Sequence, residues 1–520
     1  MSSMSYNSAA GLGGMLKDGH KHWDDAVVRN IEAAVELSSV VHTSMGPFGR
    51  HKLIVNHLEK MSVTSDCAFI LSELEVEHPA AKLLELAAKR QDRECGDGTN
   101  LVVTLAGELL RQSLHLMSMG VHTSEVIMGY QAAYEYLVHE MEGLVCQTVT
   151  KEDLVRVVAP VLAAKHYGSH MDLAPLVVQA GLCVMDGRGH ISPEAVRTVK
   201  LLGGAVATST MIPGYVATRG LDSLLTEAAN AKVVVFSCGI EASSTEAKGT
   251  VLMKNANDLL SYNKSEETKM EEIIQGIASS GVKVLVTGGT VSEMALHFID
   301  RYELLCLKLG SKFELRRLCQ ATGATALVRL GAPTPDEMGE CDSVQQITLG
   351  GKVLTFLTNP TNTKLATLVL RASTTSMLQD LERAVDDGVH ALQVACKDGR
   401  CVYGAGATEF TLAQRITTFA DLSPGLDQYA IRAFGTALKV VPRMLADTAG
   451  LDANGILADL AAANDSQVGV DLQGERVHPT TVLDLYQTKL SAIQLAVDAA
   501  LTVLRVDQII MSKQSGGPKQ

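Results

Sequence analysis

The chain has 520 residues and a mass of 55.4 kDa, too long for one hydrophobic core, so two or three domains are expected. Hydrophobic residues make up 46% of it but aromatic residues only 4%, so Ala, Val and Leu must do most of the packing. The net charge of −13 disfavours non-specific binding to nucleic acid or acidic membranes. We expect no secretory signal and no membrane span, because no uncharged apolar stretch reaches about 18 residues. The ten cysteines include no Cys-x-x-Cys pair, which is typical of a reduced cytosolic protein.

The first of three glycine-rich turns follows an N-terminal helix. Apolar residues at helical spacing predict a helix over residues 23–42, and residues 52–56 have the pattern of a short strand. The loop between them carries Gly46 and Gly49. Glycines let backbone N–H groups approach a phosphate closely, so this loop could line one. Such a loop is more often only a turn between a helix and a strand.

The second turn, Gly96-Asp97-Gly98, carries the main candidate for a metal site. It precedes a helical pattern, as does an earlier loop aspartate, Asp66, and Pro79 suits the first position of the helix between them. Free N–H groups at a helix start attract phosphate oxygens, but an aspartate there would repel them. A Mg²⁺ ion between the two anions removes this conflict, so we interpret Asp97 as part of a Mg-nucleotide site. The alternative is that Gly-Asp-Gly is an ordinary turn.

The middle of the chain changes character near residues 203–220, where glycine and proline separate short β-prone pieces and predict a domain boundary. Before it, residues 154–182 have a helical pattern interrupted near Lys165. After it, the pattern predicts strands at residues 231–238, 282–287 and 304–309 and helices at residues 292–302 and 312–322. Residues 241–272 are polar with a helical stripe. We interpret them as a projecting arm, with a solvated crossover helix as the alternative.

The C-terminal part begins with an amphipathic helix over residues 376–396 that contains Asp386 and Asp387. Neighbouring residues lie about 100° apart around a helix, so at most one of these carboxylates can aim squarely at a given site. The third glycine-rich turn, Gly404-Ala405-Gly406, leads into another helix. A long helix over residues 490–504 and a final strand over residues 506–511 are also predicted.

The motifs that are present and absent limit the reactions that the chain could catalyse. The chain has no Gly-x4-Gly-Lys-Ser/Thr loop, no His-Glu-x-x-His and no complete Gly-x-Gly-x-x-Gly. Phosphoryl transfer to water needs one carboxylate that holds a metal and another that orients or deprotonates the water. Asp97 and Asp387 could be that pair, with Asp66 as a third participant, whereas a solvated surface carboxylate is the alternative for each. The residues alone therefore point to an ATPase as one candidate.

The order of the motifs resembles that of the group II chaperonins, especially those of the eukaryotic cytosol, over nearly the whole chain. The motifs are Gly46-Pro-Phe-Gly49, Asp66, Leu74-Glu-Val-Glu-His-Pro-Ala-Ala81, Gly96-Asp-Gly-Thr99, Val286-Thr-Gly-Gly289, Gly323-Ala-Thr-Ala326, Glu382-Arg-Ala-Val-Asp-Asp-Gly388, Gly404-Ala-Gly-Ala-Thr-Glu409 and Val503-Leu-Arg-Val-Asp507.

The resemblance implies a multidomain α and α/β fold. A helical equatorial ATP-binding domain would comprise residues 1–152 and 403–520, and a small α/β intermediate domain residues 153–214 and 371–402. An α/β apical client-binding domain would take residues 215–370, with a helical lid protrusion at about 241–272.

The resemblance also implies roles for individual residues. Asp387 would be the catalytic base, Asp66 would lie beside the attacking water, Asp97 would hold Mg²⁺ and Lys165 would sense the terminal phosphate of ATP. The other nucleotide-binding positions would be Gly46, Pro47, Gly96, Gly98, Thr99, Asn100, Gly404, Ala405, Gly406 and Asp484. The client-facing helix would use Phe313, Arg316, Arg317 and Gln320.

The implied partners are seven paralogous subunits in each of two stacked eight-membered rings, together with unfolded clients such as actin and tubulin. Nucleic acid and membrane are not expected partners, and the implied location is cytoplasmic. Three departures from the family pattern are Cys67 after Asp66, Ala405 inside what is usually a triple glycine, and Pro160-Val161 ahead of Lys165. Because the carboxylates are retained, we predict retained hydrolysis. The alternatives are a structural subunit that binds nucleotide but barely turns it over, and a free-standing enzyme using Val286-Thr-Gly-Gly289 as a cofactor loop.

Overall fold

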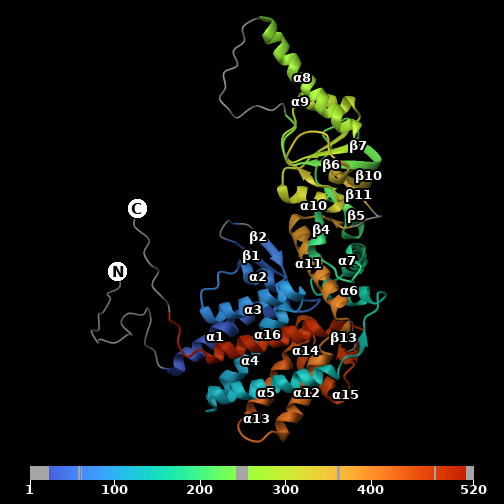
Figure 1. Cartoon of the computed structure of the whole chain (residues 1–520). Coiled ribbons are helices and arrows are strands. Elements are labelled where there is room, and N and C mark those ends of the chain that lie inside the picture. Colours follow the sequence, from blue (N-terminus) through green and yellow to red (C-terminus); the bar gives the residue numbers. More distant parts are fainter. Residues whose placement is uncertain are drawn as a thin grey trace, which may run out of the picture. The chain divides into compact units, whose positions relative to one another are not determined.

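The computed structural model describes residues 23–56, 59, 61–241, 256–359, 364–472 and 476–510. The chain forms two compact units, which Figure 1 traces by sequence colour. Unit 1 combines the described residues up to His170 with those from Asp386 onward, and unit 2 is Met171–Val385. None of the described helices has the length and apolar character needed to cross a membrane. All ten cysteines are free thiols.

Unit 1 is mainly helical. Its helices are α1 (Trp23–Val41), α2 (Cys67–Glu73), α3 (Pro79–Cys95), α4 (Thr99–Ser118), α5 (Thr123–Glu142), α6 (Leu154–Ala163), α12 (Ala407–Leu422), α13 (Asp427–Leu438), α14 (Val440–Thr448), α15 (Ala453–Ala463) and α16 (Tyr486–Arg505). The strands β1 (Lys52–Val55) and β2 (Met61–Thr64) form a hairpin, and β14 (Val468–Val470) pairs with β15 (Val477–Pro479). A small sheet has the order β16 (Leu483–Leu485), β13 (Arg400–Tyr403) and β3 (Gln147–Thr148).

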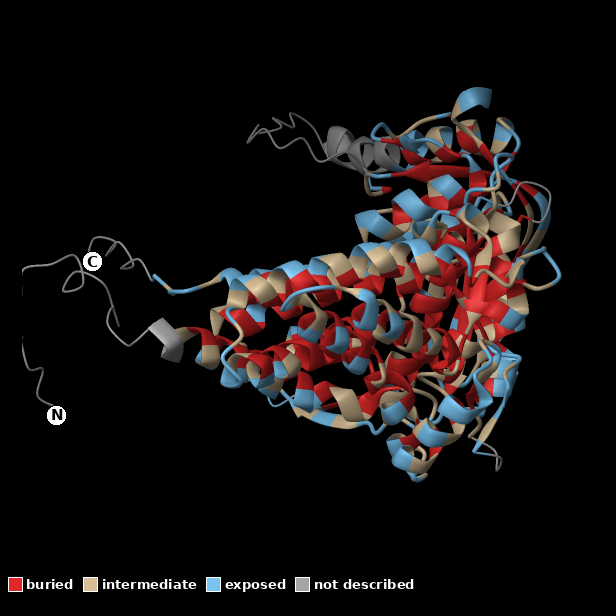
Figure 2. Cartoon of the chain, turned by 90° about the horizontal axis from the view of Figure 1, so that it is seen from below, coloured by how far each residue is buried: buried red, intermediate tan, exposed pale blue. Residues whose placement is uncertain are grey.

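Helix α4 forms the centre of the unit 1 core. Consecutive side chains from Leu101 to Leu110 are buried, so this helix is covered on every side, as expected for a helix that is apolar all round. Helices α1, α3, α5, α13 and α16 supply the surrounding buried residues, which appear red in Figure 2. The start of α4 is therefore a fixed point on which a site can be built.

The turn between α3 and α4 requires glycine twice. Gly96 ends α3 with φ of 70° and Gly98 caps α4 with φ of 81°, both in the left-handed region that other residues rarely adopt. A Cβ atom on Gly96 would also lie 2.5 Å from Cβ of His390. This double glycine turn holds Asp97 directly before the N-cap of α4.

Unit 2 is built on a mixed sheet with helices on it. The sheet has the order β4 (Val196–Leu202), β12 (Ala366–Ala372), β5 (Thr210–Ala217), β11 (Lys352–Thr358), β10 (Gly339–Leu349), β6 (Glu227–Phe236), β7 (Val282–Thr287) and β8 (Leu305–Lys308), and β9 (Ala326–Leu327) pairs with β6. The helices are α7 (His170–Val184), which begins at the last residue of the first segment of unit 1, α8 (Ala256–Ser279), α9 (Glu293–Arg301) and α10 (Lys312–Thr322). Helix α11 (Thr375–Lys397) continues from unit 2 into unit 1.

Side-chain alternation along β6 divides its buried residues between two of the hydrophobic clusters of unit 2. Val233 and Val235 of β6 join one cluster with residues of α10, while Val234 and Phe236 join another with residues of α8 and α9. Successive side chains of a strand point to opposite faces, so α10 covers one face of this part of the sheet and α8 with α9 the other. The strand pattern is a continuous apolar run because both faces are buried.

Most elements predicted from the sequence are confirmed, including α10 at its predicted bounds. The predicted strand over residues 506–511 is wrong, since residues 506–510 have no regular structure and Met511 lies outside the described residues. Residues 242–255 of the predicted arm also lie outside them. The later part of the arm continues as α8, whose Met270, Ile274 and Ile277 are buried against the sheet.

Candidate functional site

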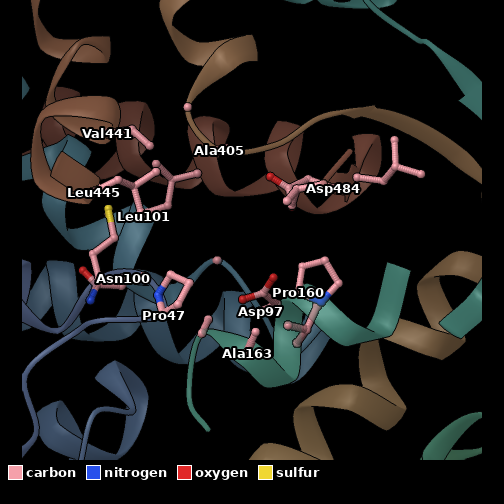
Figure 3. A pocket seen from close by; sticks show the side chains of 18 of the residues that line it. Pro47, Asp97, Asn100, Leu101, Pro160, Ala163, Ala405, Val441, Leu445 and Asp484 are labelled. Atoms are coloured by element: carbon pink, nitrogen blue, oxygen red, sulfur yellow. The ribbon is translucent and has the colours of Figure 1, made fainter. Parts of the chain in front are cut away.

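A cavity of about 930 Å³ lies in unit 1 at the start of α4. Most of the predicted nucleotide-site residues line it: Gly46, Pro47, Asp66, Asp97, Gly98, Thr99, Asn100, Lys165, Ala405, Gly406 and Asp484. In Figure 3, Asp97 and Asp484 reach the same cavity from different elements, with Pro47 and Leu445 on its wall. Residues from both ends of the chain therefore build one site.

Three predicted residues, Gly96, Asp387 and Gly404, do not line the cavity but lie directly behind its wall. A Cβ atom on Gly96 would be 3.1 Å from the carbonyl oxygen of Asp387, so the double glycine turn packs against α11. A Cβ atom on Gly404 would be 2.9 Å from Oδ2 of Asp484. The absence of a side chain at both glycines is what allows these carboxylate-bearing segments to approach the site.

The first glycine loop is a closed turn. The N–H of Gly49 donates to the carbonyl of Gly46 at 2.9 Å, and the N–H of Arg50 donates to the carbonyl of Thr43 at 2.8 Å. Gly46 has φ of 82°, and a Cβ there would lie 2.6 Å from Cδ2 of Leu445. The loop is thus a genuine turn and also part of the cavity wall.

Asp97 is half-buried, and burial together with a nearby carboxylate disfavours its charged form. Burial raises the pKa of its carboxyl, and the negative charge of Asp484 raises it further. The backbone around it is anchored, because Nε2 of Gln91 donates to the Asp97 carbonyl at 2.8 Å and to the Thr488 carbonyl at 3.1 Å. A cation would relieve the electrostatic cost of this carboxylate.

The donor set around Asp97 fits magnesium held together with a polyphosphate. Within the described ranges, no group of three or more His, Cys, Asp or Glu side chains is placed to hold a metal on its own. Mg²⁺ is commonly bound by one or two carboxylates, with phosphate oxygens and water completing its shell. Asp97 directly precedes the N-cap of α4, where the first N–H groups have no acceptor within the helix, and this suits that arrangement.

A second cluster joins Asp66, Lys165 and Asp387. Asp66 caps α2 by accepting from the N–H of Ala68 at 3.3 Å, and its Oδ1 lies 3.1 Å from Nζ of Lys165. Nζ of Lys165 also pairs with Oδ2 of Asp387. Asp66 and Asp387 are only 6% and 7% exposed, whereas Asp386 is exposed. Of the two adjacent aspartates on α11, Asp387 therefore belongs to the site.

The departure at Cys67 adds an inert side chain to this cluster. Burial raises the pKa of the Cys67 thiol, and the neighbouring Asp66 charge raises it further. The thiol therefore stays protonated and weakly nucleophilic at neutral pH. The neighbouring Ser65 hydroxyl is buried without a hydrogen-bond partner among the described residues and lines the cavity, where a ligand or water could reach it.

A buried lysine that was not among the predicted site residues, Lys489, also lines the cavity. Nζ of Lys489 lies 2.6 Å from Oε1 of Glu409 and 2.9 Å from Oδ2 of Asp484. Burial by itself lowers the pKa of this ammonium, but the carboxylates of Asp484 and Glu409 raise it above its ordinary value. Lys489 is therefore charged and holds Asp484 at the cavity wall.

Other missed lining residues follow β14. Asp471, Leu472, His478, Thr480, Thr481 and Val482 complete the cavity wall. This segment carries no glycine motif or apolar period that would mark it as part of a site. Lys489 did offer a signal, since it is a single charge at the start of an apolar helix, but the predicted helix over residues 490–504 began four residues after the observed start at Tyr486 and so left Lys489 out.

Ala405 carries a backbone conformation that suits glycine. Its φ is 55°, its carbonyl accepts from the N–H of Val470 at 3.0 Å, and it lines the cavity. The left-handed conformation costs a non-glycine residue about 1–2 kcal/mol, whereas glycine costs about 0.4–1 kcal/mol through the unfolded chain. We therefore expect Ala405→Gly to stabilise unit 1 by roughly 0.5 kcal/mol in urea unfolding. A loss of stability would show that the Ala405 methyl group contributes packing that outweighs its backbone strain.

Helix α10 lies in unit 2 and is not part of the cavity. All four predicted client-facing residues, Phe313, Arg316, Arg317 and Gln320, are exposed on it. Val286-Thr-Gly-Gly289 is also outside the cavity. A Cβ on Gly289 would lie 2.5 Å from the backbone nitrogen of Gly239, so glycine at this position allows the two backbone segments to pack closely. The motif therefore has a packing reason that needs no cofactor.

Comparison with known proteins identifies the family of the chain. Residues 37–514 match the TCP-1/cpn60 chaperonin family. The chain is 43% identical over 524 residues to the T-complex protein 1 subunit theta of Dictyostelium discoideum, covering 98% of both chains. It is 44% and 41% identical over 527 residues to the theta subunits of Arabidopsis thaliana and Homo sapiens, covering 98% of this chain and 96% of each relative. The resemblance inferred from the motif order is thus confirmed, and the chain belongs to the TCP-1/cpn60 chaperonin family.

Proposed function

We propose that this chain binds Mg-ATP in the unit 1 cavity and hydrolyses it there, as one subunit of a cytoplasmic, hetero-oligomeric double-ring chaperonin. Family membership makes the chain an ATP-dependent protein-folding chaperonin subunit. Our finer proposal is that seven paralogous subunits complete each eight-membered ring and that clients include actin and tubulin. The three-domain division stays a prediction, with the lid protrusion at about residues 241–272.

The observation that supports the ATP site is that Asp97 and a separate cluster of two aspartates and a lysine lie at the same cavity. Asp97 directly precedes the N-cap of α4. Asp66 and Lys165 line the same cavity, and Asp387, which pairs with Lys165, lies behind its wall. We assign Asp97 to Mg²⁺, which would screen the phosphate charge, and Lys165 to the terminal phosphate. Asp387 and Asp66 would orient the attacking water and accept its proton.

The remaining cavity residues supply binding. Gly46, Pro47 and the segment from Gly96 to Asn100 would contact the phosphates, while Gly404, Ala405, Gly406 and Asp484 would hold the nucleoside. Asn100 has a second task, because its Nδ2 donates to the carbonyl of Val41 at 3.1 Å and its Oδ1 accepts from Thr104 at 2.9 Å. Its amide therefore fixes the start of α4 against α1 as well.

Replacing Asp97 tests the metal assignment. In the full chain, Mg²⁺ should tighten ATP binding, and Asp97→Ala should erase that gain. The expected loss is roughly tenfold or more, since even about 1.4 kcal/mol corresponds to tenfold. Titrations of ATP with Mg²⁺ and with a chelator measure it directly. Asp471→Ala, which removes another cavity carboxylate, should keep the Mg²⁺ dependence; an unchanged Mg²⁺ dependence in Asp97→Ala would refute the assignment.

A further inference from the structure

The exposed face of α10 combines one aromatic side chain with several cations. Phe313, Arg316, Arg317 and Gln320 have the spacing of a single helical face, and Lys312 flanks it; all are exposed. Phe313 is 77% exposed. The opposite face, Leu315, Leu318 and Ala321, is buried in the sheet core. The helix is therefore fixed by one face and offers the other to a partner.

The positive charges on this face are not neutralised by the described residues. Glu314, the only acidic residue of α10, lies 2.9 Å from Nη2 of Arg197 on β4 and is thus already paired. Lys312, Arg316 and Arg317 form no ion pair with a carboxylate in the described part of the chain. Two other exposed arginines of unit 2 do have such partners: Arg301 pairs with Glu271 and Arg329 with Glu337.

This pattern is distinctive on a chain whose net charge is −13. Guanidinium groups bind carboxylates through two parallel hydrogen bonds, and Arg is weakly hydrated, so it forms such contacts at interfaces more readily than Lys. An exposed aromatic ring gains free energy when a partner covers it, and aromatic residues often anchor interfaces. Together these features favour an apolar anchor with neighbouring acidic groups in the bound segment.

We propose that the α10 face selects unfolded segments in which a bulky apolar residue is flanked by Asp or Glu. This inference rests on the proposed chaperonin function and on the client-facing role that the family resemblance implies for α10, and it specifies the chemistry of the bound segment. Phe313 would contact the apolar residue, and Arg316 with Arg317 would bind the adjacent carboxylates. Screening by salt should weaken the charge selection more than the apolar contact.

The test places a photo-cross-linking residue at Gln320 of this subunit in the assembled complex, so that capture by paralogous subunits is not counted. The probes are unfolded peptides of equal length with one Phe flanked by Glu, by Lys or by Ser. We expect the Glu peptide to be captured about five- to tenfold more than the Lys peptide, as two exposed ion pairs would give. The preference should shrink between 50 and 500 mM salt.

Two variants separate the contributions. Arg316→Glu with Arg317→Glu should reverse the preference, whereas Phe313→Ser should lower capture of all three peptides alike. The control, Arg188→Glu with Lys352→Glu, reverses two exposed charges of unit 2 outside α10 and should leave capture unchanged.

The results distinguish the inference from the client role beneath it. Equal capture of the Glu and Lys peptides, with a continuing dependence on Phe313, would overturn the charge selection and leave client binding intact. If no peptide is captured at position 320 while Phe313, Arg316 and Arg317 are unchanged, the client-binding role of α10 itself would be overturned.

Discussion

Asp387→Asn should lower ATP hydrolysis in this subunit by about 10²–10⁴-fold, the usual contribution of a positioned general base. The amide has nearly the shape of the carboxylate but cannot accept a proton from water. Lys165 keeps its pairing with Asp66 at 3.1 Å, so the cluster should remain folded. Binding of Mg-ATP should change little, because Asp387 lies behind the cavity wall.

The measurement must report on this subunit alone, since paralogous sites would mask its loss. Photo-cross-linkable ATP allows the nucleotide held by this chain in the assembled complex to be recovered and its conversion to ADP followed in a single turnover. Asp386→Asn is the matched control, because Asp386 precedes it on α11 and is exposed. Normal conversion in Asp387→Asn would instead favour a subunit that binds nucleotide for structural reasons.

Lys489→Met should destabilise the full chain by about 3–5 kcal/mol, the usual cost of removing one partner of a buried ion pair. The main loss arises at Glu409, which is only 2% exposed and would keep an uncompensated charge. Asp484 has a side chain 32% exposed and can recover hydration. Urea unfolding of the full chain measures the change in the free energy of unfolding.

A double variant separates this electrostatic cost from lost packing. Lys489→Met with Glu409→Gln removes both buried charges and should recover a large part of the stability. If the double variant is as unstable as the single one, the lysine contributes through its aliphatic chain instead.

The pH dependence of this effect has a defined sign. The folded pKa of Lys489 is raised, so its stabilisation is complete below the ordinary lysine pKa of 10.5 and is lost only as pH rises through the higher folded value. The destabilisation by Lys489→Met should therefore be constant between about pH 6 and 9.

Much of the fold was predictable because its signals are local. Pro79 marks the start of α3, and apolar period gives α4, α10 and the buried strands β6 and β7. Short strands such as β13 and β16 were missed, because a strand of three or four residues has too little pattern to separate it from a turn. Their pairing depends on partners far away in the chain.

The candidate site was partly predictable for the same reason. Gly96 and Gly98 predict a turn with left-handed backbone, and this turn positions Asp97 whatever the distant parts of the chain do. Lys489 is visible in the sequence as a single charge at the start of an apolar helix, but its pairing with Glu409, 80 positions earlier, leaves no local pattern. Residue chemistry alone could not choose between Asp386 and Asp387, whereas the family resemblance favoured Asp387, and its burial supports that choice.

Unit 1 is assembled from two segments that are far apart in the sequence, and this affects how the chain folds during synthesis on the ribosome. The side chain of Gln91 bonds the backbone of Thr488, 397 positions later, and the segment Met171–Val385 lies between the two parts of the unit. Contacts so distant cannot form until almost all of the chain has been translated, whereas the inserted unit can fold earlier. The apolar faces of α1, α3 and α4 therefore stay uncovered until α16 has been synthesised. The nascent chain is itself prone to aggregate and is a substrate for other chaperones.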